Sequence, residues 1–263
     1  MSFLVNPYVY AAPVDPDCAA FLTATGITNP TISGAVCTLV TSLKSANLWT
    51  KFNAIYPMVG GTATTHMYNL RNPANTNAAY RLSFSGGWTH SANGALPNGT
   101  NALADTFFTA NTFAILNSHH LSYYSRTNIN QTAAEIGAFQ IGTTSQINIR
   151  FSNITYYRIN GGTADWITFA DTDSSAFYLV NRTASNIVNG WRNSVKVATG
   201  SALSTFLPSW SYYLGALNNT GSASFYSSKQ CAFATIGSGL TDGEAAALYT
   251  IIQTFQTTLG RQV

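Results

Sequence analysis

Acidic side chains that could catalyse a reaction are scarce in this 263-residue sequence, which has 9 Asp and Glu residues in total. Enzymes that hydrolyse glycosidic bonds place two carboxyl groups on either side of the bond that breaks. The two glutamates are Glu135, which has no acidic neighbour in the sequence, and Glu244, which belongs to the helix-capping pattern Thr241-Asp-Gly-Glu244. The absence of a carboxylate pair predicts that the protein is not an enzyme.

The densest acidic cluster is Asp171-Thr-Asp173, and Asp165 precedes it by six residues. These carboxylates could supply part of the shell of about six to eight oxygens that calcium takes. The alternative is an Asx turn between two strands, which needs no ion and which turn-residue preferences favour. We therefore expect a turn here and keep Asp171 and Asp173 as candidate calcium ligands, with no other cofactor predicted.

The four histidines show no spacing that is typical of a metal site. His119 and His120 are adjacent, and neighbouring side chains on a strand point to opposite faces, so the two cannot bind one ion. His66 and His90 have no carboxylate or cysteine close by in the sequence. We expect all four to be surface or hydrogen-bonded residues.

Tryptophan is the residue type that offers most for recognition. Trp88, Trp166, Trp191 and Trp210 lie at or beside the predicted strand ends and turns, where an exposed indole could stack on a sugar ring. The alternative is that these rings fill the core or a subunit interface, which is the commoner fate of large aromatic side chains. We keep all four as candidate glycan-stacking residues.

Composition limits the kinds of partner. Charged residues make up 8% of the chain, hydrophobic residues 46% and aromatic residues 13%, which excludes a disordered protein. The 12 Lys and Arg residues are scattered singly, so we expect no nucleic acid partner. No apolar run approaches the roughly 20 residues of a membrane span, and the start MSFLVNPYVY lacks the features of a secretory signal. We expect no membrane span and synthesis in a cytoplasm.

Three cysteines, Cys18, Cys37 and Cys231, leave an odd thiol and share no close ligand spacing. A disulfide framework or a zinc site is therefore not expected. We interpret the three side chains as small buried apolar groups.

Two helices are predicted near the N-terminus, each beginning with a capping residue followed by proline. The first begins at Asp15-Pro16 and ends near Gly26. The second begins at Asn29-Pro30, and its apolar residues recur with the helical period. The stretch over residues 48–56 then reads as a strand or an extended arm.

The middle of the chain, from about residue 62 to 236, shows no helical period. Short segments rich in β-branched and aromatic residues alternate with turn sequences such as Asn93-Gly94 and Asn189-Gly190. Many short strands without helices between them are typical of an antiparallel sandwich. The predicted strands cover residues 80–84, 112–116, 133–139, 146–151, 155–159, 165–169, 175–180, 195–199, 211–217 and 230–236.

The predicted fold is mainly β, an antiparallel jelly-roll β-sandwich with N-terminal helices and a C-terminal capping helix. The capping box at Thr241 begins that last helix, which we expect over residues 241–259. We divide the chain into an N-terminal arm with two helices, residues 1–60, for docking or assembly, and the sandwich, residues 61–263.

The C-terminal part carries a family resemblance. Ser228–Gly237, followed by Gly239–Tyr249, resembles the closing strand and helix of laminin-G-like, concanavalin A-like jelly rolls. The Ile187-Val-Asn-Gly-Trp191 segment resembles the Asn-Gly hairpin that those domains carry in mid-sheet. This resemblance implies a concanavalin A-like fold.

Further blocks resemble a group of virion proteins of tailed bacteriophages. These blocks are residues 29–61, Arg81–His90, Gly94–Asn101 and Phe255–Arg261, so the resemblance extends over nearly the whole chain. It implies a non-enzymatic structural component exposed on the virion, as a capsid decoration, head fibre, tail fibre or baseplate subunit, assembled in the host cytoplasm. The implied partners are other virion proteins.

Low charge fits a surface buried in subunit contacts, so we also expect a homo-oligomer. The alternative function is a carbohydrate- or host-receptor-binding adhesin module, which would bind a host surface glycan through loop aromatics of the sandwich. The two functions are compatible, because an adhesive virion protein also belongs to the particle.

Overall fold

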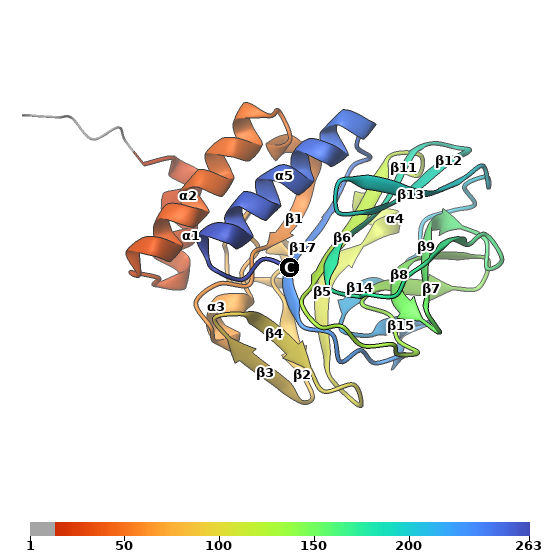
Figure 1. The fold of residues 1–263 in the computed structure, drawn as a ribbon, viewed down its shortest axis with the longest axis horizontal. Helices are drawn as coiled ribbons and strands as arrows, with labels where there is room; N and C mark the ends of the chain where they lie inside the picture. Colours follow the sequence, from red (N-terminus) through yellow and green to blue (C-terminus); the bar gives the residue numbers. More distant parts are fainter. Residues whose placement is uncertain (1–13) are drawn as a thin grey trace, which may run out of the picture.

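The computed structural model describes residues 14–263, in which two β-sheets pack face to face and long helices cover the outside of one sheet (Figure 1). The predicted mainly β, antiparallel sandwich with N-terminal and C-terminal helices is confirmed. Residues 1–13 of the predicted N-terminal arm lie outside the described residues.

The first sheet, which we call the helix-covered sheet, has the strand order β13-β12-β11-β6-β17-β4-β3, and β1 pairs with β17 beside it. All the pairings in it are antiparallel. Its strands are β1 (Phe52–Tyr56), β3 (Trp88–Ser91), β4 (Gly94–Pro97), β6 (His119–Ser125), β11 (Ala176–Ala184), β12 (Ile187–Arg192), β13 (Val195–Gly200) and β17 (Cys231–Gly237).

The second sheet, which we call the open sheet, has the order β10-β9-β8-β7-β14-β5-β2. The short strands β15 and β16 extend it beside β7, and β15 makes the parallel pair with β7. Its strands are β2 (Ser83–Ser85), β5 (Leu103–Thr109), β7 (Ile136–Gln140), β8 (Thr143–Phe151), β9 (Ile154–Gly161), β10 (Ile167–Ala170), β14 (Ser211–Leu214), β15 (Leu217–Asn219) and β16 (Ser222–Ser224).

The helices begin where the capping signals place them. Asn29 accepts hydrogen bonds from the backbone N–H groups of Thr31 and Ile32, and Thr241 and Glu244 form the predicted capping box. Gly26 ends the first helix in the left-handed conformation. The helices are α1 (Pro16–Thr25), α2 (Pro30–Ser45), α3 (Ala63–His66), α4 (Ala110–Phe113) and α5 (Asp242–Thr258), with 3-10 turns η1 (Trp49–Lys51) and η2 (Asn77–Ala79).

Two apolar cores hold these layers together. The first lies between the sheets and includes Tyr123, Ile147, Tyr157 and Tyr178. The second lies between the helix-covered sheet and α1, α2 and α5, so the N-terminal helices share a core with the sandwich. Whether residues 1–60 also dock onto a partner stays a prediction.

Around residues 110–125 one predicted strand is absent and one strand of the fold was not predicted. The segment 112–116 is not a strand, because α4 and a turn occupy it. Conversely, β6 was not predicted, although it lies near the middle of the helix-covered sheet and all of its residues are buried. Its sequence, His-His-Leu-Ser-Tyr-Tyr-Ser, lacks the apolar pattern of a buried strand, and pairing with β11 and β17 makes it one.

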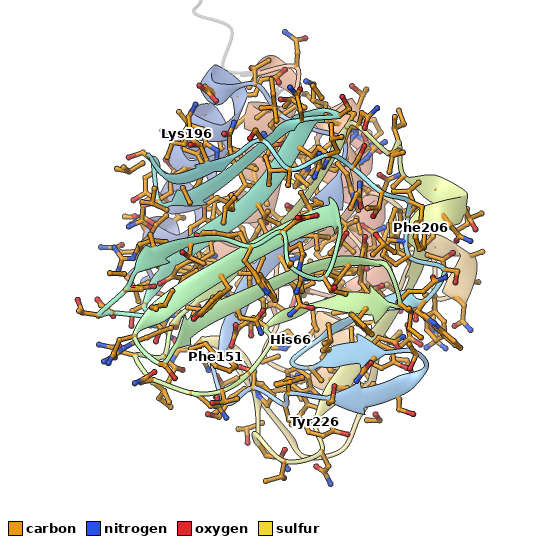
Figure 2. All side chains as sticks on the ribbon, turned by 90° about the vertical axis from the view of Figure 1, so that its right-hand side faces the viewer. His66, Phe151, Lys196, Phe206 and Tyr226 are labelled. Atoms are coloured by element: carbon orange, nitrogen blue, oxygen red, sulfur yellow. A yellow bond between two sulfur atoms is a disulfide. The ribbon has the colours of Figure 1, made fainter. Side chains whose placement is uncertain are left out.

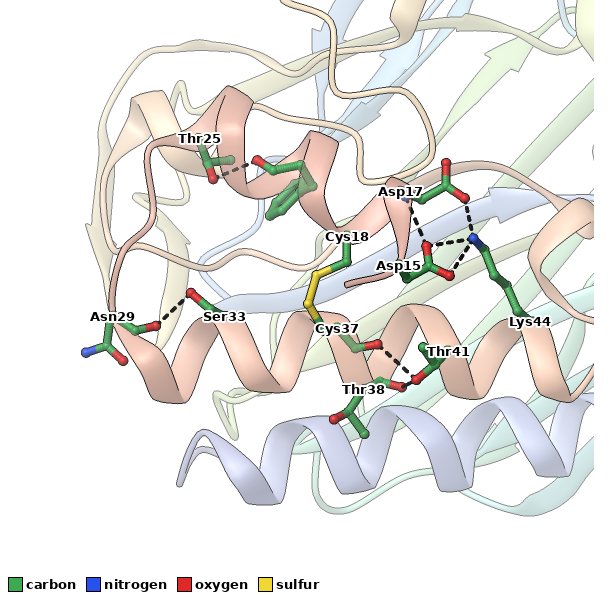
Figure 3. The surroundings of a disulfide bond; sticks show 11 residues. Asp15, Asp17, Cys18, Thr25, Asn29, Ser33, Cys37, Thr38, Thr41 and Lys44 are labelled. Atoms are coloured by element: carbon green, nitrogen blue, oxygen red, sulfur yellow. Dashed lines mark hydrogen bonds and ion pairs between the residues drawn. A yellow bond between two sulfur atoms is a disulfide. The ribbon is translucent and has the colours of Figure 1, made fainter. Parts of the chain in front are cut away.

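The expectation of free cysteines was wrong for two of the three. Cys18 of α1 and Cys37 of α2 form a disulfide, which Figure 3 shows bridging the two helices. Lys44 lies between Asp15 and Asp17, with Nζ 2.7 and 2.6 Å from their carboxylate oxygens, and its hydrogen bond lowers the pKa of Asp15. Packing of α1 against α2 brings the two sulfur atoms together across 19 residues of sequence, while Cys231 is a buried free thiol.

Candidate functional site

The open sheet carries a hollow of about 250 Å³ on its outer face, lined mainly by aromatic and amide side chains. Figure 2 looks onto this face, with Phe151 labelled near its lower edge and the long helices behind the sheet. No helix lies over the strands β8 and β9 in that view. The lining residues are Gln146, Asn148, Phe151, Tyr156, Trp166 and Phe225.

Strand alternation explains why these side chains meet. Ile147 and Tyr157 point into the core between the sheets, so the residues beside them, Gln146, Asn148 and Tyr156, point outward. Asn148 lies directly opposite Tyr156 in the register of β8 and β9. The hollow is therefore formed by the outward positions of adjacent strands.

The amides form a ladder along β8. The Thr144 hydroxyl donates to Gln146 Oε1 at 2.9 Å, Gln146 Nε2 donates to Asn148 Oδ1 at 2.7 Å, and Asn148 Nδ2 donates to the carbonyl of Ala133 at 2.6 Å. These bonds fix the amide planes, and each NH₂ group retains a second N–H. Gly137 lies opposite Gln146 on β7, and a Cβ there would lie 2.4 Å from Gln146 Cβ, so glycine is required for this arrangement.

Four aromatic rings stand around the ladder. Tyr156 packs edge-on against both Phe151 and Trp166, with ring centroids 5.7 and 5.5 Å apart. Trp166 is half-buried, so part of its indole faces the hollow. Phe225 is 44% exposed and has φ of 51°, a conformation that costs a non-glycine residue about 1–2 kcal/mol. An exposed apolar ring is thus held on a strained backbone at the rim.

A buried ion pair anchors the loop that carries Phe225. Glu135 and Lys229 have fully buried side chains, with Lys229 Nζ 3.1 Å from Glu135 Oε1. The Ser227 hydroxyl and the backbone N–H of Ile149 also donate to the Glu135 carboxylate, at 2.9 and 2.6 Å. Breaking a buried pair by removing one partner leaves an uncompensated charge, so this cluster fixes the loop to β8. Glu135 has a structural role that its isolated position in the sequence did not suggest.

Arg158 lies beneath the indole of Trp166. The guanidinium carbon of Arg158 is 3.5 Å from the centroid of the indole, which is a cation–π contact, and Arg158 is 5% exposed. Burial lowers the pKa of Arg158 to about 10, so the group stays protonated at neutral pH. The indole therefore contacts both this guanidinium and the ring of Tyr156, which is nearly perpendicular to it.

The structure separates the four predicted stacking residues. Trp166 lines the hollow, and Trp210 is 40% exposed elsewhere, against Gly221. Trp88 is partly buried and donates its indole N–H to the carbonyls of Ser85 and Leu103. Trp191 is 5% exposed and lies in the core beneath the helices, so the prediction that it could stack on a sugar was wrong.

The aspartates proposed as calcium ligands already face cationic and hydroxyl groups. Arg192 lies 3.7 Å from Asp171 and 3.8 Å from Asp173, and the hydroxyls of Thr155 and Tyr178 donate to Asp171 Oδ2. The backbone N–H of Asp173 donates to Asp171 Oδ1, which is the Asx turn of the alternative interpretation. A calcium ion would have to displace the guanidinium, and within residues 14–263 no three His, Cys, Asp or Glu side chains gather as a metal site.

Three of the four histidines are buried and kept neutral by that burial. The pKa of His66 is lowered to about 3, that of His119 to about 4 and that of His120 to about 3. His119 contacts Asn160 between the sheets, and His120 contacts Thr235 on the helix side, as expected for neighbours on one strand. His66 Nδ1 lies 2.9 Å from His90 Nδ1.

Of the six residues that line the hollow, Trp166 was predicted from the sequence and the other five were not. The available signal was the alternation of polar and apolar residues over 144–149, followed by Tyr156. The register that brings Asn148 opposite Tyr156, and the loop that brings Phe225 over β8, depend on long-range pairing.

Comparison with known proteins supports the fold. The sequence matches no family model and no curated protein. The botulinum neurotoxin serotype D binding domain is similar at 7% identity and a TM-score of 0.51, over 77% of this chain and 52% of that one. Domain 4 of AbnA, an extracellular arabinanase of Geobacillus stearothermophilus in complex with arabinotriose, has 14% identity, a TM-score of 0.41 and coverage of 75% and 98%.

A third similar structure is the NanB sialidase of Streptococcus pneumoniae, at 12% identity and a TM-score of 0.37, over 62% of this chain and 27% of that one. Of these three structures, the neurotoxin domain is similar enough to support a β-sandwich fold in common, and its 7% identity supports nothing beyond the fold. The helices described here include none that is long and apolar enough to cross a membrane. The chain is a β-sandwich with one outer face under helices and one open face that carries an aromatic and amide hollow.

Proposed function

We propose that the protein binds a carbohydrate in the hollow of the open sheet. The single observation that carries the proposal is the convergence of Trp166, Tyr156 and Phe151 with the fixed amides of Gln146 and Asn148. The C–H face of a sugar ring is apolar and stacks on an aromatic ring, while its hydroxyls need donors and acceptors at the edge. Both are present here within one hollow.

Binding without catalysis fits the lining of this hollow. Its six residues include no carboxylate, and glycosidic bond hydrolysis needs a pair. The hollow has a volume of about 250 Å³, just below the range of small-molecule pockets. It would therefore hold part of an oligosaccharide, and the rest of the chain would extend into solvent through the open side. We therefore assign the protein to the recognition of glycans.

The test is a glycan array screen of the purified protein, followed by calorimetry with the best oligosaccharide. Trp166→Ala should weaken binding by at least about tenfold, because truncated aromatic anchors cost about 2 kcal/mol or more. Trp210→Ala is the matched control, since it removes an exposed indole that does not line the hollow. Absence of any bound glycan, or equal affinity of Trp166→Ala and the wild type, would refute the proposal.

The virion location implied by the resemblance remains a prediction and is compatible with this function. A glycan-binding module on a particle would attach it to a host surface. The Cys18–Cys37 disulfide supports the proposal that the protein acts in an oxidising environment, because disulfides are rare in the reducing cytoplasm. Antibody labelling of purified phage particles tests the location, and light scattering of the purified protein tests the predicted homo-oligomer.

A further inference from the structure

Arg158 differs from the other buried arginines in how its guanidinium is used. In Arg261, Nε donates to Gln256 Oε1 at 2.6 Å, Nη1 to the carbonyl of Met58 at 2.7 Å and Nη2 to that of Pro57 at 2.6 Å. Arg158 makes one hydrogen bond, from Nη1 to the carbonyl of Gly162 at 2.9 Å. Its Nε is buried and has no partner within residues 14–263.

The unused edge of Arg158 is the one that carboxylates bind. Nε and Nη2 lie side by side on the planar group, and a carboxylate accepts from both in a bidentate pair. In the described part of the chain no carboxylate lies within ion-pair distance of Arg158, whereas Arg192 faces both Asp171 and Asp173. The charge of Asp165 acts on Arg158 from beyond contact distance, and Asp165 Oδ2 accepts from the backbone N–H of Gly162. A buried cation with no carboxylate in direct contact is costly, and a buried N–H without an acceptor adds to that cost.

Arg158 lies directly beside the hollow, behind its lining residues. Arg158 lies directly opposite Gln146 in the register of β8 and β9, and it follows Tyr156 by two residues, so its side chain projects from the same outer face. Trp166 stacks on its guanidinium. Gln146, Tyr156 and Trp166 of the lining therefore surround Arg158, which lies behind them at 5% exposure, so a ligand in the hollow reaches its Nε edge when the Trp166 side chain shifts.

We propose that the sugar bound in the hollow carries a carboxylate, which Arg158 binds through Nε and Nη2. This inference rests on the proposed carbohydrate-binding function and narrows its ligand class to sugar acids, of the uronic or sialic acid type. The amides of Gln146 and Asn148 then bind hydroxyls, and Trp166 stacks on the ring. The ligand's carboxylate supplies the direct contact that Asp165 does not make.

The first experiment varies the ligand and leaves the protein unchanged. Calorimetry measures binding of oligogalacturonate and of sialyllactose, each beside its methyl ester, which keeps the sugar and removes the charge. The acid of at least one pair should bind about tenfold or more tightly than its ester, because hydrogen bonds to charged groups are the stronger ones. The two pairs distinguish a uronic acid from a sialic acid.

The second experiment varies the protein. Arg158→Gln should reduce the affinity for the acid to that for the ester, with thermal unfolding checked to confirm the fold. Arg81→Gln is the control, since it removes the same charge beside β2, at the other edge of the open sheet. If Arg158→Gln weakens acid and ester equally, Arg158 only holds Trp166 in place and the inference is wrong.

The outcomes separate this inference from the proposed function. If neutral sugars or esters bind as tightly as acids and Trp166→Ala abolishes that binding, carbohydrate binding stands and the acidic class is refuted. If no oligosaccharide binds, both fail. If Arg158→Gln does not fold, the wild-type protein alone tests the inference: tighter binding of the acid than of its ester supports it, and equal binding refutes it.

Discussion

The two sheets place their outward side chains in opposite environments. On the helix-covered sheet the outward positions Phe177, Leu179 and Phe233 are buried beneath α1, α2 and α5 in an apolar core. On the open sheet the outward positions Gln146 and Tyr156 line a hollow. The same strand alternation therefore builds a buried apolar core where helices cover the sheet and leaves an open hollow where they do not.

This difference predicts that aromatic truncation has opposite consequences on the two faces. A ring removed beneath the helices leaves a cavity, whereas a ring removed from the hollow leaves water. Ordered by the effect expected at a single site, four predictions follow from the largest to the smallest.

Phe233→Ala should destabilise the protein by about 3–5 kcal/mol. The ring is fully buried and packs edge-on against Phe255 of α5, with centroids 5.8 Å apart. Urea unfolding followed by circular dichroism measures the change, and glycan affinity of the folded fraction should stay at the wild-type value. A loss below 1 kcal/mol would contradict the role assigned to the helix-covered face.

Cys37→Ser, which removes the Cys18–Cys37 disulfide, should lower stability by up to about 3 kcal/mol. The reason is the loop of 19 residues that the bond closes in the unfolded chain. Chemical denaturation of the variant, beside the Cys231→Ser control, measures the effect. Hydrogen exchange should locate the loss in α1 and α2, and faster exchange in β8 and β9 instead would contradict the separation of the two faces.

Acid should destabilise the protein through three buried histidines. His66, His119 and His120 remain neutral in the fold because burial holds their pKa values at about 3 to 4, against about 6.5 when unfolded. The unfolded chain therefore takes up protons first, and stability, complete above pH 6.5, falls as the pH drops toward 4. The loss is about 2 kcal/mol per histidine by pH 5.

Denaturant titrations between pH 7.5 and 5 measure this dependence. The strongly shifted histidines lie in α3 and β6, and none lines the hollow. A free energy of unfolding that stays constant over this range would show that these side chains are accessible to protons in the folded state.

Phe225→Gly should be about 1 kcal/mol more stable than Phe225→Ala, because glycine adopts φ of 51° without strain. Both variants lose the ring at the rim, so both should lose glycan affinity to the same extent. Thermal unfolding and calorimetry on the pair separate the two effects. If the alanine variant is the more stable one, the strain at this position is not as the structure indicates.

Local signals were the predictable part of the fold. Caps at Asn29 and Thr241 involve residues two or three positions apart, so the sequence contains all that determines where α2 and α5 begin. Strand β6 escaped notice because its polar residues are buried through hydrogen bonds to distant partners, such as Ser122 to Thr235. The Cys18–Cys37 bond depends on two helices lying side by side, which no spacing rule encodes.

The candidate site was predictable to the same limited degree. Trp166 stood out as an aromatic residue beside a turn, but Trp191 stood out equally and is buried by helices that pack over it. The amides of Gln146 and Asn148 gain meaning through their register with β9. In the sequence Arg158 is one of several scattered cations. In the fold it makes one hydrogen bond, whereas all three nitrogens of the Arg261 guanidinium donate hydrogen bonds.

The most direct test of the account maps ligand contacts over both faces of the deuterated protein by NMR. Addition of the oligosaccharide selected by the array should shift the side-chain amides of Gln146 and Asn148 and the indole N–H of Trp166. The signals of Trp191, beneath the helices, should not move. Shifts confined to α2 and α5, or spread without preference over both faces, would contradict the claim that the open sheet is the binding surface.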